Sequence, residues 1–496
     1  MARRATQTGL GSLVIGSLVL AGLIVVGCGT ESSSTFDNGG EDGTSGGPGS
    51  SGGPFPTDPL DPNGPKPCEG LQCKQEACAN GATTELTGTV YDPSGTVALY
   101  NAVVYVPNAP VEPFKPGVTC DNCGTALSGK PIATAITDSH GKFALKNVPV
   151  GVDVPLVIQI GRWRRQITVP AANVEKCGSK PLDAAVTRLP RTRAEGDIPK
   201  IAITTGNADS LECFVRKLGI DPAEFTNPGN DPSNGRINLY QGLRTNNNGS
   251  KINAQTPAAS TLWDNLDELK KYDIVILSCE GSENNTTKDG AAHPNARSNI
   301  NAYLEAGGRV FASHFHYTWY KNNSSGQLSS TATWSGSQSD GDRNVLVDTS
   351  FAKGKAFSEW LDFNQATTAP ASNTVAMKEL RANVTTVPGN GAPSPDVSRR
   401  WLYTNVNNAE QAKFYTFNSP IGVAPDKQCG RGVYTDIHVS AGDIAETPNI
   451  PDFPNNCTSQ GFTAQEKALL FLLFDLSACV QDDNKPPSAP PPVNVK

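Results

Sequence analysis

The first 28 residues constrain this chain most, because they decide the compartment in which it folds. Arg3 and Arg4 precede an apolar run from Leu10 to Val26, which ends in Gly27 and Cys28. A positive start, a short apolar core and a small residue before the cut are typical of an export signal. We therefore expect residues 1–27 to be a signal peptide and the mature chain to fold in an oxidising compartment.

Cys28 follows the small residue directly, and this arrangement resembles a bacterial lipobox. The resemblance implies cleavage before Cys28, lipid on its thiol and attachment to a membrane. The residue after the cysteine is Gly29 and not an aspartate. By the same resemblance, this favours the outer membrane, on its periplasmic or its surface side. An uncleaved membrane anchor and an ordinary signal with a chance cysteine stay open, although the run is short for a span.

The charge balance excludes some partners. Cleavage removes two of the 41 basic residues and none of the 48 acidic ones, so the mature chain has 39 basic residues and a net charge of −9. Nucleic acids and anionic lipid surfaces need basic patches. We expect neither as a partner, and since no second apolar run is long enough to cross a bilayer, the lipid would be the membrane anchor.

The cysteine count predicts a disulfide framework. With Cys28 given to lipid, 11 of the 12 cysteines remain, and an exported chain pairs most of them. The odd number leaves at least one thiol unpaired. Cys68, Cys73 and Cys78 lie in a cysteine-rich segment at residues 67–83. A metal site is the alternative there, but disulfides are favoured because no histidine lies near.

Two segments have compositions that cannot build a core. Residues 28–66 consist of the lipidated cysteine followed mainly by Gly, Ser, Pro, Asp and Thr, which is typical of a flexible tether. Residues 482–496 carry two proline runs, and we predict a disordered tail there.

Residues 84–190 alternate apolar and polar positions in short runs between Gly and Pro turns, a pattern typical of a β-sandwich. We predict strands over residues 86–91, 102–106, 133–137, 142–145, 155–160 and 165–169. Three segments of this region, at 88–92, 137–143 and 147–151, resemble the carboxypeptidase regulatory-like domain. The resemblance implies a transthyretin-like sandwich without catalysis of its own.

Cys120 and Cys123 lie in a loop insertion of this sandwich. A redox pair with this spacing would open a helix of an α/β domain. We therefore expect a loop disulfide.

After a linker at 188–199, apolar runs alternate with helical patterns up to residue 481. We predict strands at 200–205, 272–277, 309–312 and 432–439, and helices at 209–218, 262–271, 297–306 and 468–479. A capping box, Thr463 to Glu466, opens the last helix. Apolar strands that alternate with helices indicate a parallel sheet covered on both faces. The predicted fold is thus a β-sandwich followed by a flavodoxin-like α/β domain at 198–481, with a polar insertion at 321–396 that holds one helix near 357–361.

Polar residues gather where the predicted strands of this domain end. Ligands of open parallel sheets bind beyond the carboxyl ends of the strands, and three of the five histidines fall there. Glu280 follows one strand and is a further candidate. The predicted ligand-binding residues are His314, His316, Trp319, Asp436 and His438.

Segments 272–276, 307–314 and 430–438 resemble the ThuA-like branch of the class I glutamine amidotransferase-like fold. The resemblance implies a carbohydrate ligand. Amidotransferases place a nucleophilic cysteine on a tight turn after a strand, but here that turn holds Ser313 and His314. Amide hydrolysis by that mechanism is therefore not expected.

Three interpretations of the histidines stay open. In the first, His314, His316 and His438 bind zinc, with Glu280 or Asp436 as a further ligand. In the second, His314 or His438 acts as an acid or base with one of these carboxylates. In the third, which is favoured, the histidines orient loops or line a cleft without chemistry.

Cys279 has two interpretations. A nucleophile would need a nearby histidine and a lowered pKa. A structural cysteine would pair with Cys213, which lies on the helix after the first strand of the domain. We predict the disulfide Cys213–Cys279, because the two strands are expected to be neighbours. Cys429, Cys457 and Cys479 would then share one bridge and leave one thiol over.

These features favour a lipid-anchored envelope protein that binds carbohydrate or another surface component without catalysis. The alternative is an envelope hydrolase that acts on a glycan or an ester, using His314, His316 and His438 with Glu280. The first function needs no cofactor, and the second would depend either on a metal ion, with zinc as the candidate, or on the histidines alone.

Overall fold

The computed structural model describes residues 68–492, except 124, 207, 232, 244–247, 337–338, 389–396, 440–451 and 458–460. Residues 65–496 belong to one compact unit. The predicted signal peptide, the lipidated Cys28 and the tether lie outside the described residues. Within the described part of the chain, no helix is long and apolar enough to cross a membrane.

The N-terminal part of the described chain, which we call the sandwich half, consists of two small sheets. All six strands predicted from the alternating pattern are present, with a short seventh strand after them. One sheet has the order β4-β1-β7 and the other the order β3-β2-β5-β6. The strands are β1 (Glu85–Thr89), β2 (Val103–Pro107), β3 (Pro131–Ile136), β4 (Lys142–Lys146), β5 (Val154–Ile160), β6 (Trp163–Val169) and β7 (Ser179–Pro181).

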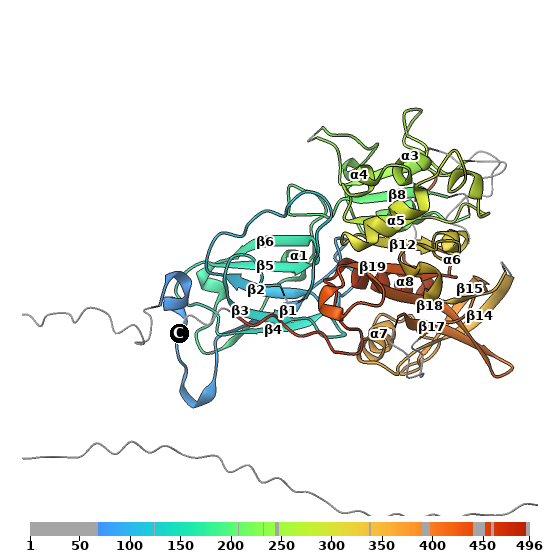
Figure 1. Cartoon of the computed structure of the whole chain (residues 1–496). Helices are drawn as coiled ribbons and strands as arrows, with labels where there is room; N and C mark the ends of the chain where they lie inside the picture. Colours follow the sequence, from blue (N-terminus) through green and yellow to red (C-terminus); the bar gives the residue numbers. More distant parts are fainter. Residues whose placement is uncertain are drawn as a thin grey trace, which may run out of the picture. The chain divides into compact units, whose positions relative to one another are not determined.

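The α/β half that follows is built on one mixed sheet of ten strands, in the order β15-β14-β17-β18-β19-β12-β11-β8-β10-β9. Figure 1 labels several strands of this sheet, among them β8, β12 and β19. From β19 to β9 the neighbouring strands are parallel, as predicted, whereas β15, β14, β17 and β18 are antiparallel to their neighbours. The strands are β8 (Ile201–Thr205), β9 (Phe225–Thr226), β10 (Ile237–Gln241), β11 (Ile274–Leu277), β12 (Arg309–Ser313), β14 (Ser339–Val347), β15 (Thr374–Arg381), β17 (Arg399–Val406), β18 (Ala409–Ser419) and β19 (Gly430–Thr435); β13 (Thr333–Trp334) and β16 (Val384–Thr386) form a separate pair.

The helices are mostly short. They are α1 (Ala184–Thr187), α2 (Leu211–Lys217), α3 (Ser260–Trp263), α4 (Leu266–Leu269), α5 (Ala296–Glu305), α6 (Thr318–Lys321), α7 (Ala352–Phe363) and α8 (Ala464–Ser477). The one helix predicted over 262–271 is two, because Asn265 leaves the helical conformation and its side chain caps α4. The 3-10 turns are η1 (Gly70–Lys74), η2 (Ala79–Gly81), η3 (Ala171–Asn173), η4 (Pro222–Glu224), η5 (Asn285–Thr287), η6 (His314–Tyr317), η7 (Ser325–Thr331) and η8 (Pro425–Lys427).

The predicted polar insertion at 321–396 is part of the fold. It contains the predicted helix, α7, but also β14 and β15, which extend the large sheet. The buried residues of β15, Val375, Met377 and Leu380, are separated by exposed ones, of which Lys378 and Glu379 are charged. Antiparallel strands at a sheet edge keep one face in water, so their sequences are polar enough to be mistaken for loops.

Both faces of the parallel strands are covered, and β11 shows how. Ile274 and Ile276 pack into the core on one face, which also contains α2 and α8. Val275 and Leu277 pack into a second core that contains α3 and α5. Successive side chains of a strand point to opposite faces, so an unbroken apolar run fills both layers, as the sequence indicated.

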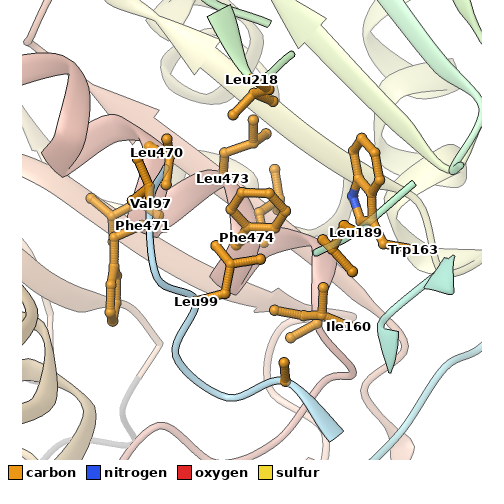
Figure 2. Packing of buried hydrophobic residues seen from close by; sticks show 14 of the residues in the cluster. Val97, Leu99, Ile160, Trp163, Leu189, Leu218, Leu470, Phe471, Leu473 and Phe474 are labelled. Atoms are coloured by element: carbon orange, nitrogen blue, oxygen red, sulfur yellow. The ribbon is translucent and has the colours of Figure 1, made fainter. Parts of the chain in front are cut away.

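The helix α8 joins the sandwich to the large sheet. The ring centroids of Phe474 and Trp163 are 5.9 Å apart, and Phe471 stacks on Tyr100 with a centroid distance of 5.5 Å. Trp163 and Tyr100 belong to the sandwich half. Figure 2 shows these α8 side chains among residues of both halves, including Leu99 and Ile160. The predicted capping box at its start is present. A helix that is apolar all round is buried on every side, and the two halves therefore share one hydrophobic core.

Disulfides add covalent links, and their pairing differs from the prediction. The predicted bridge Cys213–Cys279 is wrong, because Cys213 pairs with Cys457 and Cys279 is a free, buried thiol. Cys429, Cys457 and Cys479 do not share a bridge: each pairs with a different cysteine. The five bridges are Cys68–Cys73, Cys78–Cys177, Cys120–Cys429, Cys123–Cys479 and Cys213–Cys457.

The loop of the sandwich that carries Cys120 and Cys123 is therefore fastened to the large sheet. One bridge reaches the residue before β19, and the other reaches a residue just after α8. The expected disulfide within the loop is replaced by two bridges out of it, which fix the sandwich against the α/β half.

The predicted disordered tail is wrong for its first residues. Asp483 is buried and pairs with Arg431 at 2.9 Å and with Lys353 at 3.0 Å. Burial raises the pKa of Asp483, but the two cations outweigh it and hold that pKa below its usual range. Ion pairing, which the polar and proline-rich composition does not reveal, orders this segment.

Candidate functional site

Three side chains meet at the carboxyl edge of the large sheet. Cys279 lies two residues after β11, His314 directly after β12 and His438 three residues after β19. These strands are adjacent and parallel, in the order β19-β12-β11. Their carboxyl ends therefore open at the same edge, where ligands of such sheets bind.

The donor atoms of these residues converge. The Sγ atom of Cys279 lies 3.1 Å from Nδ1 of His314, and the rings of His314 and His438 are 4.9 Å apart. One donor atom from each of the three residues lies within 4.8 Å of the other two. We call this set the Cys279–His314–His438 cluster.

The cluster is shielded from water and uncharged. Its members are at most 4% exposed. Burial raises the pKa of Cys279 to about 12, so the thiol keeps its proton. Burial, together with the neighbouring His438, lowers the pKa of His314 to about 2, and burial with Arg381 lowers that of His438 to about 4. Neutral imidazoles have a free lone pair, which is what a metal ion requires.

Two ring nitrogens of the cluster have unmet hydrogen-bonding capacity. The Nε2 atoms of His314 and His438 are buried and find no partner among the described residues. A buried polar atom without a partner costs about 1–3 kcal/mol. Such atoms point to a ligand, an ion or a bound water at this position.

The backbone at His314 is also unusual. Its φ angle is +43°, in the left-handed region that few residues other than glycine adopt. This is the tight turn after β12 that the sequence placed at Ser313 and His314. The turn directs the imidazole toward the ends of β11 and β19, and conformations of this kind gather at functional sites.

Asp209 supports the cluster from behind. Its buried carboxylate accepts a hydrogen bond from the Ser313 hydroxyl and another, at 2.9 Å, from the backbone N–H of Val439. These two residues are the neighbours of His314 and His438. Burial raises the pKa of Asp209 to about 7. One carboxylate thus fixes the two segments that carry the imidazoles.

His316 does not join the cluster, contrary to the predicted histidine triad. Its Nε2 atom lies 2.8 Å from the carbonyl oxygen of Ser278, and its Nδ1 accepts a hydrogen bond of 2.9 Å from the Trp319 indole. Both ring nitrogens are used, so neither can bind a ligand. Trp319 is itself buried against Trp263, at 5.0 Å, rather than lining a ligand site. Together, His316 and Trp319 hold in place the segment that leads into Cys279.

The two carboxylates proposed as further ligands are engaged elsewhere. Glu280 forms a buried ion pair with Lys288 at 2.5 Å. Asp436 accepts hydrogen bonds from the side-chain amide of Asn383 and the hydroxyl of Tyr434, each at 2.8 Å. Within the described residues, the cluster of three therefore contains no carboxylate.

The sequence placed His314 and His438 correctly at one sheet edge but missed Cys279 as their partner. Its signal was present, because Cys279 follows β11 just as His314 follows β12. The prediction that Cys279 pairs with Cys213 excluded Cys279 from the candidate site.

Comparisons with known proteins leave the family open. No protein family model matches the chain, and no curated protein matches it. Among solved structures, the chain is similar to a protein described as ThuA-like from Bacteroides uniformis, with 11% sequence identity and a TM-score of 0.26. That similarity covers 48% of this chain and 80% of the other.

Proposed function

We propose that the α/β half binds one transition-metal ion through Cys279, His314 and His438. The observation that carries the proposal is the convergence of a thiol and two imidazoles within 4.8 Å, all buried. Thiolate and imidazole are the ligands that zinc and copper prefer in proteins, whereas calcium and magnesium prefer oxygen. We expect zinc, with copper as the ion that competes with it.

Metal binding accounts for the cluster better than a cysteine–histidine nucleophile. A reactive cysteine needs a lowered pKa and an ion-paired histidine, but here burial raises the pKa of Cys279 to about 12. A metal ion reverses that by displacing the thiol proton. It would also give a partner to a ring nitrogen that now lacks one.

Three protein ligands leave a coordination position for water or substrate, which is the arrangement of catalytic rather than structural zinc. From this we infer the hydrolase alternative, with a glycan or an ester as substrate, which would have to displace the groups that cover a cluster at most 4% exposed. In that role the metal would lower the pKa of its water. Asp209 would hold the two histidines in place.

A carbohydrate ligand is a second candidate, and one observation favours it. The rings of Phe315, Tyr317 and Trp334 form a row beside His314, with centroids 4.0–6.2 Å apart. Phe315 and Trp334 are half-buried. Partly exposed rings offer apolar faces to a ligand.

Lipid attachment at an outer membrane remains a prediction from the sequence.

The metal proposal is tested by elemental analysis of the full chain purified without an affinity histidine tag. We expect close to one zinc or copper ion per chain, and little metal in the variants Cys279→Ser and His314→Ala. Cobalt substitution should give a thiolate charge-transfer absorption in the wild-type protein but not in Cys279→Ser. His140→Ala, which changes a histidine in a turn of the sandwich, is the matched control and should keep the metal.

Two outcomes would contradict the proposal. One is a wild-type chain that takes up neither zinc, copper nor cobalt after reconstitution. The other is equal metal content in wild type, Cys279→Ser and His314→Ala, which would place the ion elsewhere.

A further inference from the structure

A cavity of about 730 Å³ lies at the opposite, amino edge of the large sheet. It is formed by both halves of the molecule. The sandwich contributes the loop 113–117 and Arg162, and the α/β half contributes residues around Lys200, Arg236 and Lys270. Ligand sites occur preferentially at such junctions, and a volume of this order suits a small organic molecule.

The walls of this cavity are basic, in a chain whose net charge is −7. Lys200 and Arg236 directly precede β8 and β10, so the topology brings their side chains to one edge. Three acidic side chains, Asp197, Asp231 and Asp267, also line the cavity. The basic side chains that line it are Lys115, Arg162, Arg193, Lys200, Arg236, Lys270 and Lys271.

Several acids near the cavity already have cationic partners. Asp197 pairs with Arg164 at 2.8 Å, outside the cavity wall. Asp273, behind the wall, lies 2.9 Å from Arg162 and 3.9 Å from Arg236, so one carboxylate serves two guanidinium groups.

Two further acids lie against the remaining cations. Glu268 pairs with Lys271 at 2.7 Å, and Glu224 lies 3.6 Å from Arg193. Even with these acids behind the wall included, cations outnumber acids.

Three lysines are left with positive charge to offer. No ion pair of Lys115, Lys200 or Lys270 is found among the described residues. Lys200 is half-buried, and its Nζ lies 5.1 Å from the centre of the Tyr272 ring. Burial first, and then Arg236 and Lys271, lower its pKa, although the nearby acids Glu268 and Asp273 oppose this. Neighbouring cations repel one another and lower one another's pKa, and a bound anion relieves that repulsion.

The cavity is formed before any ligand enters. Gly117 has a φ angle of +76°, and a Cβ atom there would lie 2.8 Å from the carbonyl oxygen of Lys270. This close approach lets the N–H of Val118 bond that carbonyl at 2.8 Å. The Phe114 ring lies 4.0 Å from the guanidinium of Arg164. The loop is thus fixed to the α/β half by the Val118–Lys270 bond and to β6 by the Phe114–Arg164 contact, and a ligand need not order it.

We propose that this cavity binds a small organic molecule with two or more phosphate or sulfate groups. Lysine and arginine recognise these oxyanions through charge-assisted hydrogen bonds. The limited volume of the cavity and the acidity of the chain as a whole disfavour long polyanions such as nucleic acid. This site is separate from the metal site and does not depend on it.

The test is titration calorimetry of the disulfide-bonded full chain with two probes, inorganic pyrophosphate and a heparin-derived sulfated disaccharide. Wild type should bind at least one probe, and the bound probe identifies the anion. The variant K115E/K200E/K270E should lose affinity by about tenfold or more, because three cations that can donate charge-assisted hydrogen bonds to the anion are replaced by carboxylates that repel it.

The control K142E/K146E/K427E changes net charge equally at exposed lysines away from the cavity and should lose much less affinity. If the triple cavity variant fails to fold, the single variant K115Q, at an exposed position, should still weaken binding measurably. Equal losses in the cavity and control variants would overturn the proposal. So would a wild-type protein that binds neither probe.

Discussion

The joint around α8 and the Cys279–His314–His438 cluster are both buried, yet they are built in opposite ways. At the joint, Phe471 and Phe474 meet aromatic residues of the sandwich, and apolar groups of this kind need no partner. At the cluster, the Nε2 atoms of His314 and His438 are buried without one. The joint also has two disulfides beside it, while the thiol of Cys279 is free.

The difference separates stability from function. Burying apolar surface stabilises the fold by about 25 cal/mol for each Å² removed from water, whereas an unpaired buried polar group lowers stability by about 1–3 kcal/mol. The joint therefore supplies stability, and the cluster lowers it unless something binds there.

The largest expected effect is at the joint. Phe474→Ala removes a ring that is 3% exposed and should lower the free energy of unfolding by about 3–5 kcal/mol. Denaturant titration measures it. Val423→Ala, at a side chain that is 40% exposed, is the control and should change stability by less than about 0.5 kcal/mol. Similar losses in both variants would show that α8 does not hold the halves together.

The covalent part of the joint comes next. Replacing both members of the bridge Cys123–Cys479 with serine should cost about 2–5 kcal/mol, because with Cys120–Cys429 intact the bridge still closes a loop of about 50 residues in the unfolded chain, mainly the stretch from Cys429 to Cys479. The matched control is Cys68–Cys73, which closes only five. Its loss should be clearly smaller when both variants are unfolded in the same denaturant, and the reverse order would contradict this account.

A bound metal ion should reduce the difference between the joint and the cluster in what each contributes to stability. Zinc at about 100 times its Kd should stabilise the wild-type chain by about 2.7 kcal/mol, and a chelator should remove that gain. Thermal unfolding with and without zinc measures the shift. Cys279→Ser should unfold at the same temperature in both conditions, and a zinc effect that persists in this variant would argue against the cluster as the site.

The smallest effect concerns Asp209. Asp209→Asn keeps the size of the side chain but weakens its hold on Ser313 and Val439. We expect zinc affinity to fall by about tenfold, as is usual for groups that orient metal ligands, with the fold unchanged by circular dichroism. Competition with a chromophoric chelator gives the affinity. Asp289→Asn, at a side chain that is 61% exposed, should leave it unaltered.

The sequence predicted those parts of the fold whose patterns are local. Alternating runs located the strands of the sandwich, and fully apolar runs located β8, β11 and β12. The strands β14 and β15 were missed because they bury only one face, and their other residues are polar. Composition alone does not distinguish such strands from a loop.

The candidate site was predicted in part for a related reason. The ends of parallel strands lie together whatever the loops do, so His314 and His438 could be placed side by side. Disulfide pairing depends instead on long-range geometry that a spacing does not encode. The wrong partner for Cys213 therefore hid Cys279 from the site. The side chains of His316 and Trp319 were predicted at the ligand site but lie elsewhere. The conformation of a single turn decides the direction of such side chains, and the sequence pattern does not show it.

The bridges of the sandwich loop also decide how the molecule carries a mechanical load. If a pull acts along the chain from its first described residues to its last, the shortest covalent path leaves the backbone at Cys123 and rejoins it at Cys479. The intervening backbone, with the Cys279–His314–His438 cluster and all ten strands of the large sheet, lies off that path. A protein held at one end and loaded at the other would thus shield its candidate site from the force.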